Sequence, residues 1–116
     1  MTRGEVHWAR VGGGRHPVVV LSMSENRVRA MMVVAPATEP IEGVAVEVRL
    51  GAFGGLPVGA VVRVALRRPD FIPCQWLVTV SKDDVMEHAG ALSPEKLAEV
   101  ENLLRRGGLG DALAAG

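Results

Sequence analysis

The fold of this chain is decided by the stretch Arg15-His16-Pro17-Val18-Val19-Val20-Leu21-Ser22. Pro17 fixes its own φ and pushes His16 towards an extended backbone. The apolar run that follows is too short for a helix and rich in β-branched residues, so it predicts a strand at 17–22 that is buried on both faces. A glycine triplet, Gly12-Gly13-Gly14, precedes it. We interpret residues 11–16 as a flexible loop that presents Arg15 and His16 at the rim of the sheet, where functional sites are often built.

Length and composition narrow the class of protein. The 116 residues suit one domain, and 48% hydrophobic with 22% charged residues is typical of a soluble globular chain. A formal net charge of zero argues against a protein that holds nucleic acid by bulk positive charge, although it leaves room for a local grip on a few phosphates. The single cysteine, Cys74, excludes an intramolecular disulfide and a cysteine-based metal cluster. With no apolar run typical of a signal peptide or a membrane span, we expect a cytoplasmic protein.

Short apolar runs separated by glycine and proline predict a mainly β fold. The clearest alternation of apolar and polar residues is at 44–50, which predicts a strand with one apolar and one polar face. Residues 83–86 are expected to form a short turn of helix. Because the spacing is near-regular and lacks a βαβ rhythm, we expect a small barrel or sandwich. Beside the strand at 17–22, the predicted strands are 5–10, 30–35, 44–50, 60–66 and 74–80.

The end of the chain carries the signals of a helix. Ser93 is a good N-cap and Pro94 suits the first helical position. Glycines at 107 and 108 end the helix, with basic residues just before them. We therefore expect one domain over residues 1–106 and a flexible C-terminal tail over residues 107–116. The apolar face of this helix comprises Leu97, Val100, Leu103 and Leu104.

Several segments together match one protein family in order along nearly the whole chain. They are Arg3-Gly4-Glu5-Val6 with Trp8; His16-Pro17-Val18-Val19-Val20-Leu21-Ser22 with Asn26; Val33-Val34-Ala35-Pro36-Ala37-Thr38; Gly55-Leu56-Pro57; Gln75; and Leu92-Ser93-Pro94-Glu95-Lys96-Leu97. With these segments the chain resembles the MazF/PemK-type toxins, which are sequence-specific endoribonucleases (mRNA interferases) of type II toxin–antitoxin systems.

The resemblance implies a fold, a chemistry and partners. The implied fold is a small SH3-like β-barrel of the CcdB/MazF type with a C-terminal α-helix. The implied activity is metal-independent cleavage of single-stranded RNA, with no cofactor. The implied partners are a second copy of the chain in a homodimer and an acidic antitoxin that neutralises the toxin.

The catalytic candidates come from the family's pattern, an arginine directly before the proline of the second strand and a threonine two residues after the proline of the third. Thr38 occupies the threonine position, whereas His16 occupies the arginine position and Arg15 precedes it. The first loop is also shorter than is usual in the family. We assign His16 as acid or base, Arg15 as a charge clamp on phosphate oxygens and Thr38 as a positioning group.

RNA-binding candidates are polar groups that could read unstacked bases or hold phosphates. Gln75 matches a family position that faces the RNA, although a glutamine at a sheet edge can equally pair with backbone. Ser22 and Asn26 either contact a base or bond the local backbone. Arg67 and Arg68 form a basic step beside a proline turn, which either touches phosphate or is simply solvated.

Two further functions remain open on the same scaffold. The first is a catalytically impaired, MazF-like binding protein, which the histidine at position 16 and the short loop favour. The second is a gyrase-targeting toxin of the CcdB type. It ranks lower because the chain ends Ala112-Leu113-Ala114-Ala115-Gly116, without an aromatic tip. We assign no metal site, because His7 and His88 have no ligating partner near them in the sequence.

Overall fold

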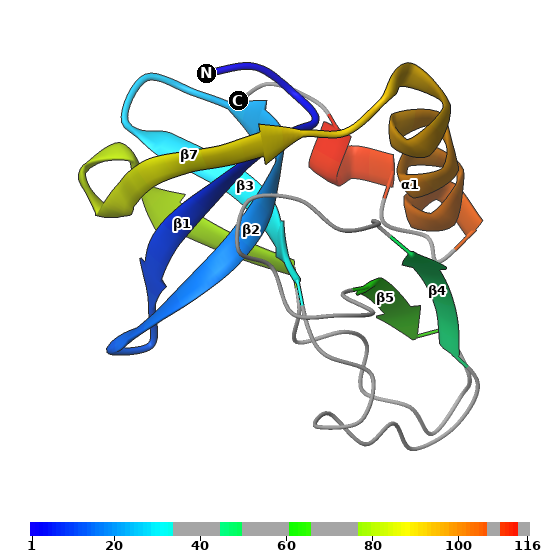
Figure 1. Ribbon diagram of the computed structural model, residues 1–116, viewed down its shortest axis with the longest axis horizontal. Coiled ribbons are helices and arrows are strands. Elements are labelled where there is room, and N and C mark those ends of the chain that lie inside the picture. The colour runs from blue at the N-terminus through cyan, green and yellow to red at the C-terminus, as the bar shows by residue number, and fades with distance from the viewer. Residues whose placement is uncertain (34–44, 50–60, 66–76, 107–109, 114–116) are drawn as a thin grey trace.

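A computed structural model of the chain describes residues 1–33, 45–49, 61–65, 77–106 and 110–113. Figure 1 shows a twisted sheet with the helix beside it. The elements in chain order are β1 (Glu5–Val11), β2 (Gly14–Met23), β3 (Arg27–Met32), β4 (Ala45–Arg49), β5 (Val61–Ala65), β6 (Leu77–Ser81), the 3₁₀ turn η1 (Lys82–Asp84), β7 (Val85–Ala91), α1 (Pro94–Arg106) and the 3₁₀ turn η2 (Gly110–Leu113).

Five strands form the main sheet in the order β6-β3-β2-β1-β7, with every neighbouring pair antiparallel. β4 and β5 form a separate antiparallel ribbon. The predicted mainly β class with a C-terminal helix is therefore confirmed. The predicted barrel holds only loosely, because the five-stranded sheet is open among the described residues, with β6 and β7 at its edges. Within the same residues, no helix is long and apolar enough to cross a membrane.

The hairpin between β1 and β2 corrects the prediction of a flexible loop at 11–16. Val11 pairs directly with Gly14, so the turn contains only Gly12 and Gly13, with φ of 58° and 81°. Two positive φ values in a two-residue turn match the right-handed twist of the flanking strands, and glycine adopts them without a steric penalty. Arg15 consequently belongs to β2 and lies in a paired, extended ribbon.

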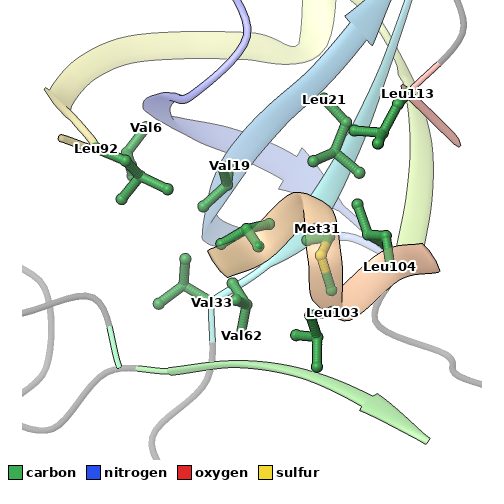
Figure 2. Packing of buried hydrophobic residues seen from close by; sticks show 11 residues of the cluster. Val6, Val19, Leu21, Met31, Val33, Val62, Leu92, Leu103, Leu104 and Leu113 are labelled. Carbon is green, nitrogen blue, oxygen red and sulfur yellow. The ribbon is translucent and has the colours of Figure 1, made fainter. Parts of the chain in front are cut away.

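The prediction that residues 17–22 are buried on both faces is confirmed, because all six of them are buried. One face of the sheet, called here the helix face, packs against α1, and Figure 2 shows its cluster. The other face, called the far face, carries a second cluster. The helix-face cluster comprises Val6, Val19, Leu21, Met31, Val33, Val62, Leu92, Val100, Leu103, Leu104 and Leu113. The far-face cluster comprises Ala9, Val18, Val20, Val28, Ala30 and Val80.

The C-terminal helix begins and ends as predicted. Ser93 Oγ accepts a hydrogen bond from Lys96 N at 3.2 Å, which satisfies one free amide of the first turn. Glu101 pairs with Arg105 at 3.6 Å on the outer side. The predicted apolar face is also confirmed, since Leu103 and the other members of that face join the helix-face cluster.

Two segments differ from the sequence-based expectation. The 3₁₀ turn lies at Lys82–Asp84, and the chain from Val85 to Ala91 is the edge strand β7, which the sequence analysis did not predict. Part of the predicted flexible tail is docked, because Gly110–Leu113 form η2 and Leu113 is buried in the helix-face cluster.

The start of the chain fastens these parts together. Arg3 donates from Nε to the Leu21 carbonyl at 2.8 Å and from a terminal nitrogen to the Leu113 carbonyl. Gly4 donates to the Val20 carbonyl and accepts from Leu92 N, both at 2.8 Å. The N-terminal segment thereby links β2, η2 and the entry to α1.

Candidate functional site

The helix face of the β1–β2 hairpin carries an aromatic ring beside cationic groups. The guanidinium carbon of Arg15 lies 4.7 Å from the centroid of the Trp8 ring, which is half-buried. Arg15 also pairs with Glu87 of β7. Arg10 lies directly opposite Arg15 in the register and pairs with Asp84 at 3.8 Å. An exposed ion pair is worth little in water, so phosphate oxygens can replace either carboxylate at small cost.

His16 projects from the far face of the same strand. Its register partner is Ala9, a member of the far-face cluster. The imidazole packs against Gly14, since a Cβ built on that glycine would lie 3.1 Å from His16 Nε2. Glycine at position 14 thus leaves the space in which the ring sits.

The structure therefore separates two of the three predicted catalytic residues. Successive side chains of a strand point to opposite faces, and Arg15 contacts Trp8 on one face while His16 packs on Gly14 on the other. The two cannot grip one phosphate together in this arrangement. The third, Thr38, lies outside the described residues.

The predicted RNA-binding residues that the structure describes lie at the opposite end of β2 from Arg15. Ser22 is buried and pairs in register with Arg29, and it takes part in the polar contacts of the fold. Asn26 is exposed in the turn after β2, and its carbonyl accepts from Lys82 N at 2.9 Å. Ser22 lies seven positions along the strand from Arg15, a distance of about 23 Å. The remaining three candidates, Gln75, Arg67 and Arg68, lie outside the described residues.

A cluster that the sequence analysis missed lies where β1 meets β7. His7 and His88 are register partners, with ring centroids 5.0 Å apart and an interplanar angle of 78°. Glu5 Oε1 lies 3.0 Å from His7 Nε2 and 3.7 Å from His88 Nε2. One ligand atom from each of the three residues lies within 4.8 Å of the others. The only sequence signal was Glu5 and His7 at the two-residue spacing of one strand face.

Hydrogen bonds hold the carboxylate of this cluster ionised. Thr2 donates to Glu5 Oε2 from its backbone N at 2.8 Å and from its hydroxyl at 2.6 Å. The Thr2 hydroxyl, followed by His7, lowers the pKa of Glu5 from 4.5 to about 2. Because Thr2 occupies Oε2, the other oxygen is left facing the two imidazoles.

The chain matches one protein family model and is similar to a solved structure. The family model of PemK-like, MazF-like toxins of type II toxin–antitoxin systems matches residues 2–107. No sequence of a curated protein matches the chain significantly. Among solved structures, an endoribonuclease from a mycobacterial species, in complex with its cognate antitoxin, is similar with a TM-score of 0.57. That match has 19% sequence identity and covers 90% of this chain and 88% of the other, so it supports the fold alone.

Proposed function

Since the chain belongs to the PemK-like, MazF-like toxin family of type II toxin–antitoxin systems, we propose that it is an endoribonuclease toxin that cuts single-stranded RNA at specific sequences. The observation that carries this proposal is the family match over residues 2–107. It is supported by the contact of an indole with an arginine on the hairpin, a combination suited to stacking a base and holding its phosphate. We propose that residues 1–106 act as one catalytic domain.

The proposed cleavage uses the 2′-hydroxyl of the RNA and no metal. A base removes the hydroxyl proton, the oxygen attacks the adjacent phosphorus, and the bond to the 5′-oxygen breaks as an acid protonates that oxygen. The products are a 2′,3′-cyclic phosphate and a 5′-hydroxyl. His16 is assigned as the acid or base because an imidazole ring can both accept and donate a proton.

Thr38 is assigned to donate a hydrogen bond to a phosphoryl oxygen. Val33, the described residue nearest to Thr38 in the sequence, lies beside the hairpin, since Val33 N donates to the Pro17 carbonyl at 2.9 Å. Thr38 follows Val33 by five residues in the sequence, a reach of about 18 Å at most. His16, adjacent to Pro17, is therefore within range of that segment.

Arg15 is assigned to a neighbouring phosphate. Its contact with Trp8 places a cation beside a ring on which a base can stack. When an RNA strand passes along the hairpin, one of its phosphates would replace Glu87 as the ion-pair partner of Arg15. Arg15 would then bind the RNA and fix its position along the hairpin, while His16 would transfer the proton. Ser22, Asn26 and the candidates outside the described residues would contact more distant nucleotides.

The proposed partners follow from the family. A toxin of a type II pair is neutralised by a protein antitoxin, and the similar solved structure is described as a complex with one. We propose an acidic antitoxin, a homodimeric toxin and a cytoplasmic location. Sedimentation equilibrium of the purified chain at micromolar concentration tests the dimer directly.

Incubation of the protein with a long single-stranded RNA in EDTA, followed by sequencing of the new 5′ ends, tests the proposed activity. Discrete cuts with 5′-hydroxyl ends are expected and would reveal the recognition sequence. Intact RNA would contradict the proposal. It would favour the second candidate, a binding protein without hydrolysis, which the separation of Arg15 and His16 on opposite faces supports.

A further inference from the structure

We propose that Glu5, His7 and His88 form a binding site for a zinc ion that fastens β7 to β1, separately from the RNA-cleaving residues. The three side chains come from two neighbouring strands, with Glu5 and His7 on one side of β1 and His88 opposite His7 on β7. β7 is an edge strand among the strands that the structure describes, and its pairing with β1 is interrupted by register shifts around His7. A metal bridge would add a second connection between β1 and β7 at the point where the hydrogen-bond ladder is irregular.

Two of the three ligand separations are close to those around a tetrahedral ion, and the whole set lies within 4.8 Å. Zinc binds imidazole nitrogen and carboxylate oxygen at about 2.0–2.1 Å, so two ligands of one tetrahedral ion lie roughly 3.3 Å apart. The distances from Glu5 Oε1 to the two Nε2 atoms, 3.0 and 3.7 Å, lie on either side of this value. The Nε2 atom of each imidazole therefore lies near the same carboxylate oxygen, while the two rings meet edge to face.

Neighbouring groups already orient two of the three ligands. Thr2 holds Glu5 Oε2 through two hydrogen bonds and leaves Oε1 for the ion. The Met86 carbonyl lies 3.5 Å from His7 Nδ1, where it can accept the proton of the ring once Nε2 binds metal. Carboxylate and carbonyl partners of this kind fix the tautomer and orientation of metal-binding histidines.

The ligand set favours zinc over the common alkaline-earth ions. Two imidazoles and one carboxylate suit Zn²⁺, whereas Mg²⁺ and Ca²⁺ prefer oxygen ligands alone. Three protein ligands leave a fourth position open to water or another exchangeable ligand. His88 is more than half exposed, so solvent reaches the site from that side.

Calorimetric titration of the metal-free full-length chain with Zn²⁺ tests the site, with thermal unfolding as a second readout. We expect one ion per chain and a rise in Tm of about 10 °C at a hundredfold excess over Kd. His88→Ala should weaken binding by at least about 100-fold, because it deletes one ligand from an exposed position where the fold tolerates the change. Thr2→Ala, which removes one of the two bonds to Glu5, should weaken it by about 10-fold.

Control variants separate this site from other sources of affinity. His16→Gln removes the third histidine and Cys74→Ser the only thiol, and both should leave zinc binding unchanged. Mg²⁺ should neither bind nor raise Tm. Failure of Zn²⁺ to bind, or equal binding by His88→Ala and the unaltered chain, would overturn the proposal. RNA cleavage in EDTA is independent of these outcomes, so either proposal can fail alone.

Discussion

Arg15 and His16 are neighbours in the sequence but project from opposite faces of β2. Arg15 lies over Trp8, with its guanidinium carbon 4.7 Å from the ring centroid, whereas His16 packs beside Gly14 on the far face. A flexible loop could have turned both side chains towards one substrate. The paired ribbon does not, because register fixes the face of every residue. The two residues should consequently affect different steps of RNA cleavage.

His16→Ala should lower kcat by about 10²- to 10⁴-fold, the usual contribution of a general acid or base. Arg15→Ala should mainly raise KM, because we propose that Arg15 binds a neighbouring phosphate. Single-turnover cleavage of a short RNA that contains the recognised sequence separates the two effects. Unchanged cleavage by His16→Ala together with a collapse of kcat in Arg15→Ala would move the chemistry to the arginine.

Trp8 and Arg15 should contribute differently to RNA affinity. Trp8→Leu removes a stacking surface worth about 1–3 kcal/mol per base, so Kd should rise about 5- to 150-fold. Arg15→Ala should reduce the slope of log Kd against log salt by about one, because one phosphate contact is lost. Fluorescence anisotropy with a labelled RNA across a salt series measures both. Arg106→Ala, at an exposed position at the end of α1, is the matched control and should change neither quantity.

Gly14→Ala should impair cleavage with little loss of stability. The new Cβ would lie 3.1 Å from His16 Nε2, so the imidazole must shift. Gly12→Ala is the control, because its Cβ meets nothing within 4 Å while its φ of 58° is strained for alanine. We expect Gly12→Ala to lower the stability of the fold and leave the cleavage rate unchanged. Gly14→Ala should lower the cleavage rate and leave the stability nearly unchanged. Identical rates for Gly14→Ala and the unaltered chain would show that ring placement does not matter.

Gly4→Ala should destabilise the fold by about 2–4 kcal/mol. Its φ of 90° strains an L residue, and the added Cβ would lie 3.1 Å from a Leu97 methyl group of α1. Gly13→Ala shares the strain, with φ of 81°, but has open space around its Cβ. Urea unfolding of both variants isolates the packing component as their difference. Equal midpoints would indicate that Leu97 moves aside freely.

The sequence predicted the parts of this fold that local chemistry determines. The short, β-branched apolar run after Pro17 favours a buried strand, and Ser93 followed by Pro94 is a local signal for the start of a helix. Both predictions are confirmed. β7 was missed because Val85–Ala91 mixes Glu87, His88 and a glycine with apolar residues, and its pairing is irregular. That these residues form a strand depends on their pairing with β1, which is distant in the sequence, rather than on their own pattern of apolar and polar residues.

The candidate site was less predictable for the same reason. The strands at 5–10 and 17–22 were expected. The face on which each residue lies depends on the turn length, however, and the glycine triplet suggested a longer loop than the two-residue turn that forms. His7 and His88 are 81 positions apart, and only the register of β1 and β7 makes them neighbours. Composition and spacing along the chain hold no information about that register.

The two-glycine turn has a kinetic consequence. A hairpin closed by Gly12 and Gly13 and paired along its length keeps Trp8, Arg15 and His16 in place before any ligand arrives. Binding then involves no loss of loop entropy on this segment, because the backbone is already ordered. RNA should dock on the hairpin in a single fast step at a rate set by encounter, and variants of the strand should change the lifetime of the complex rather than its formation.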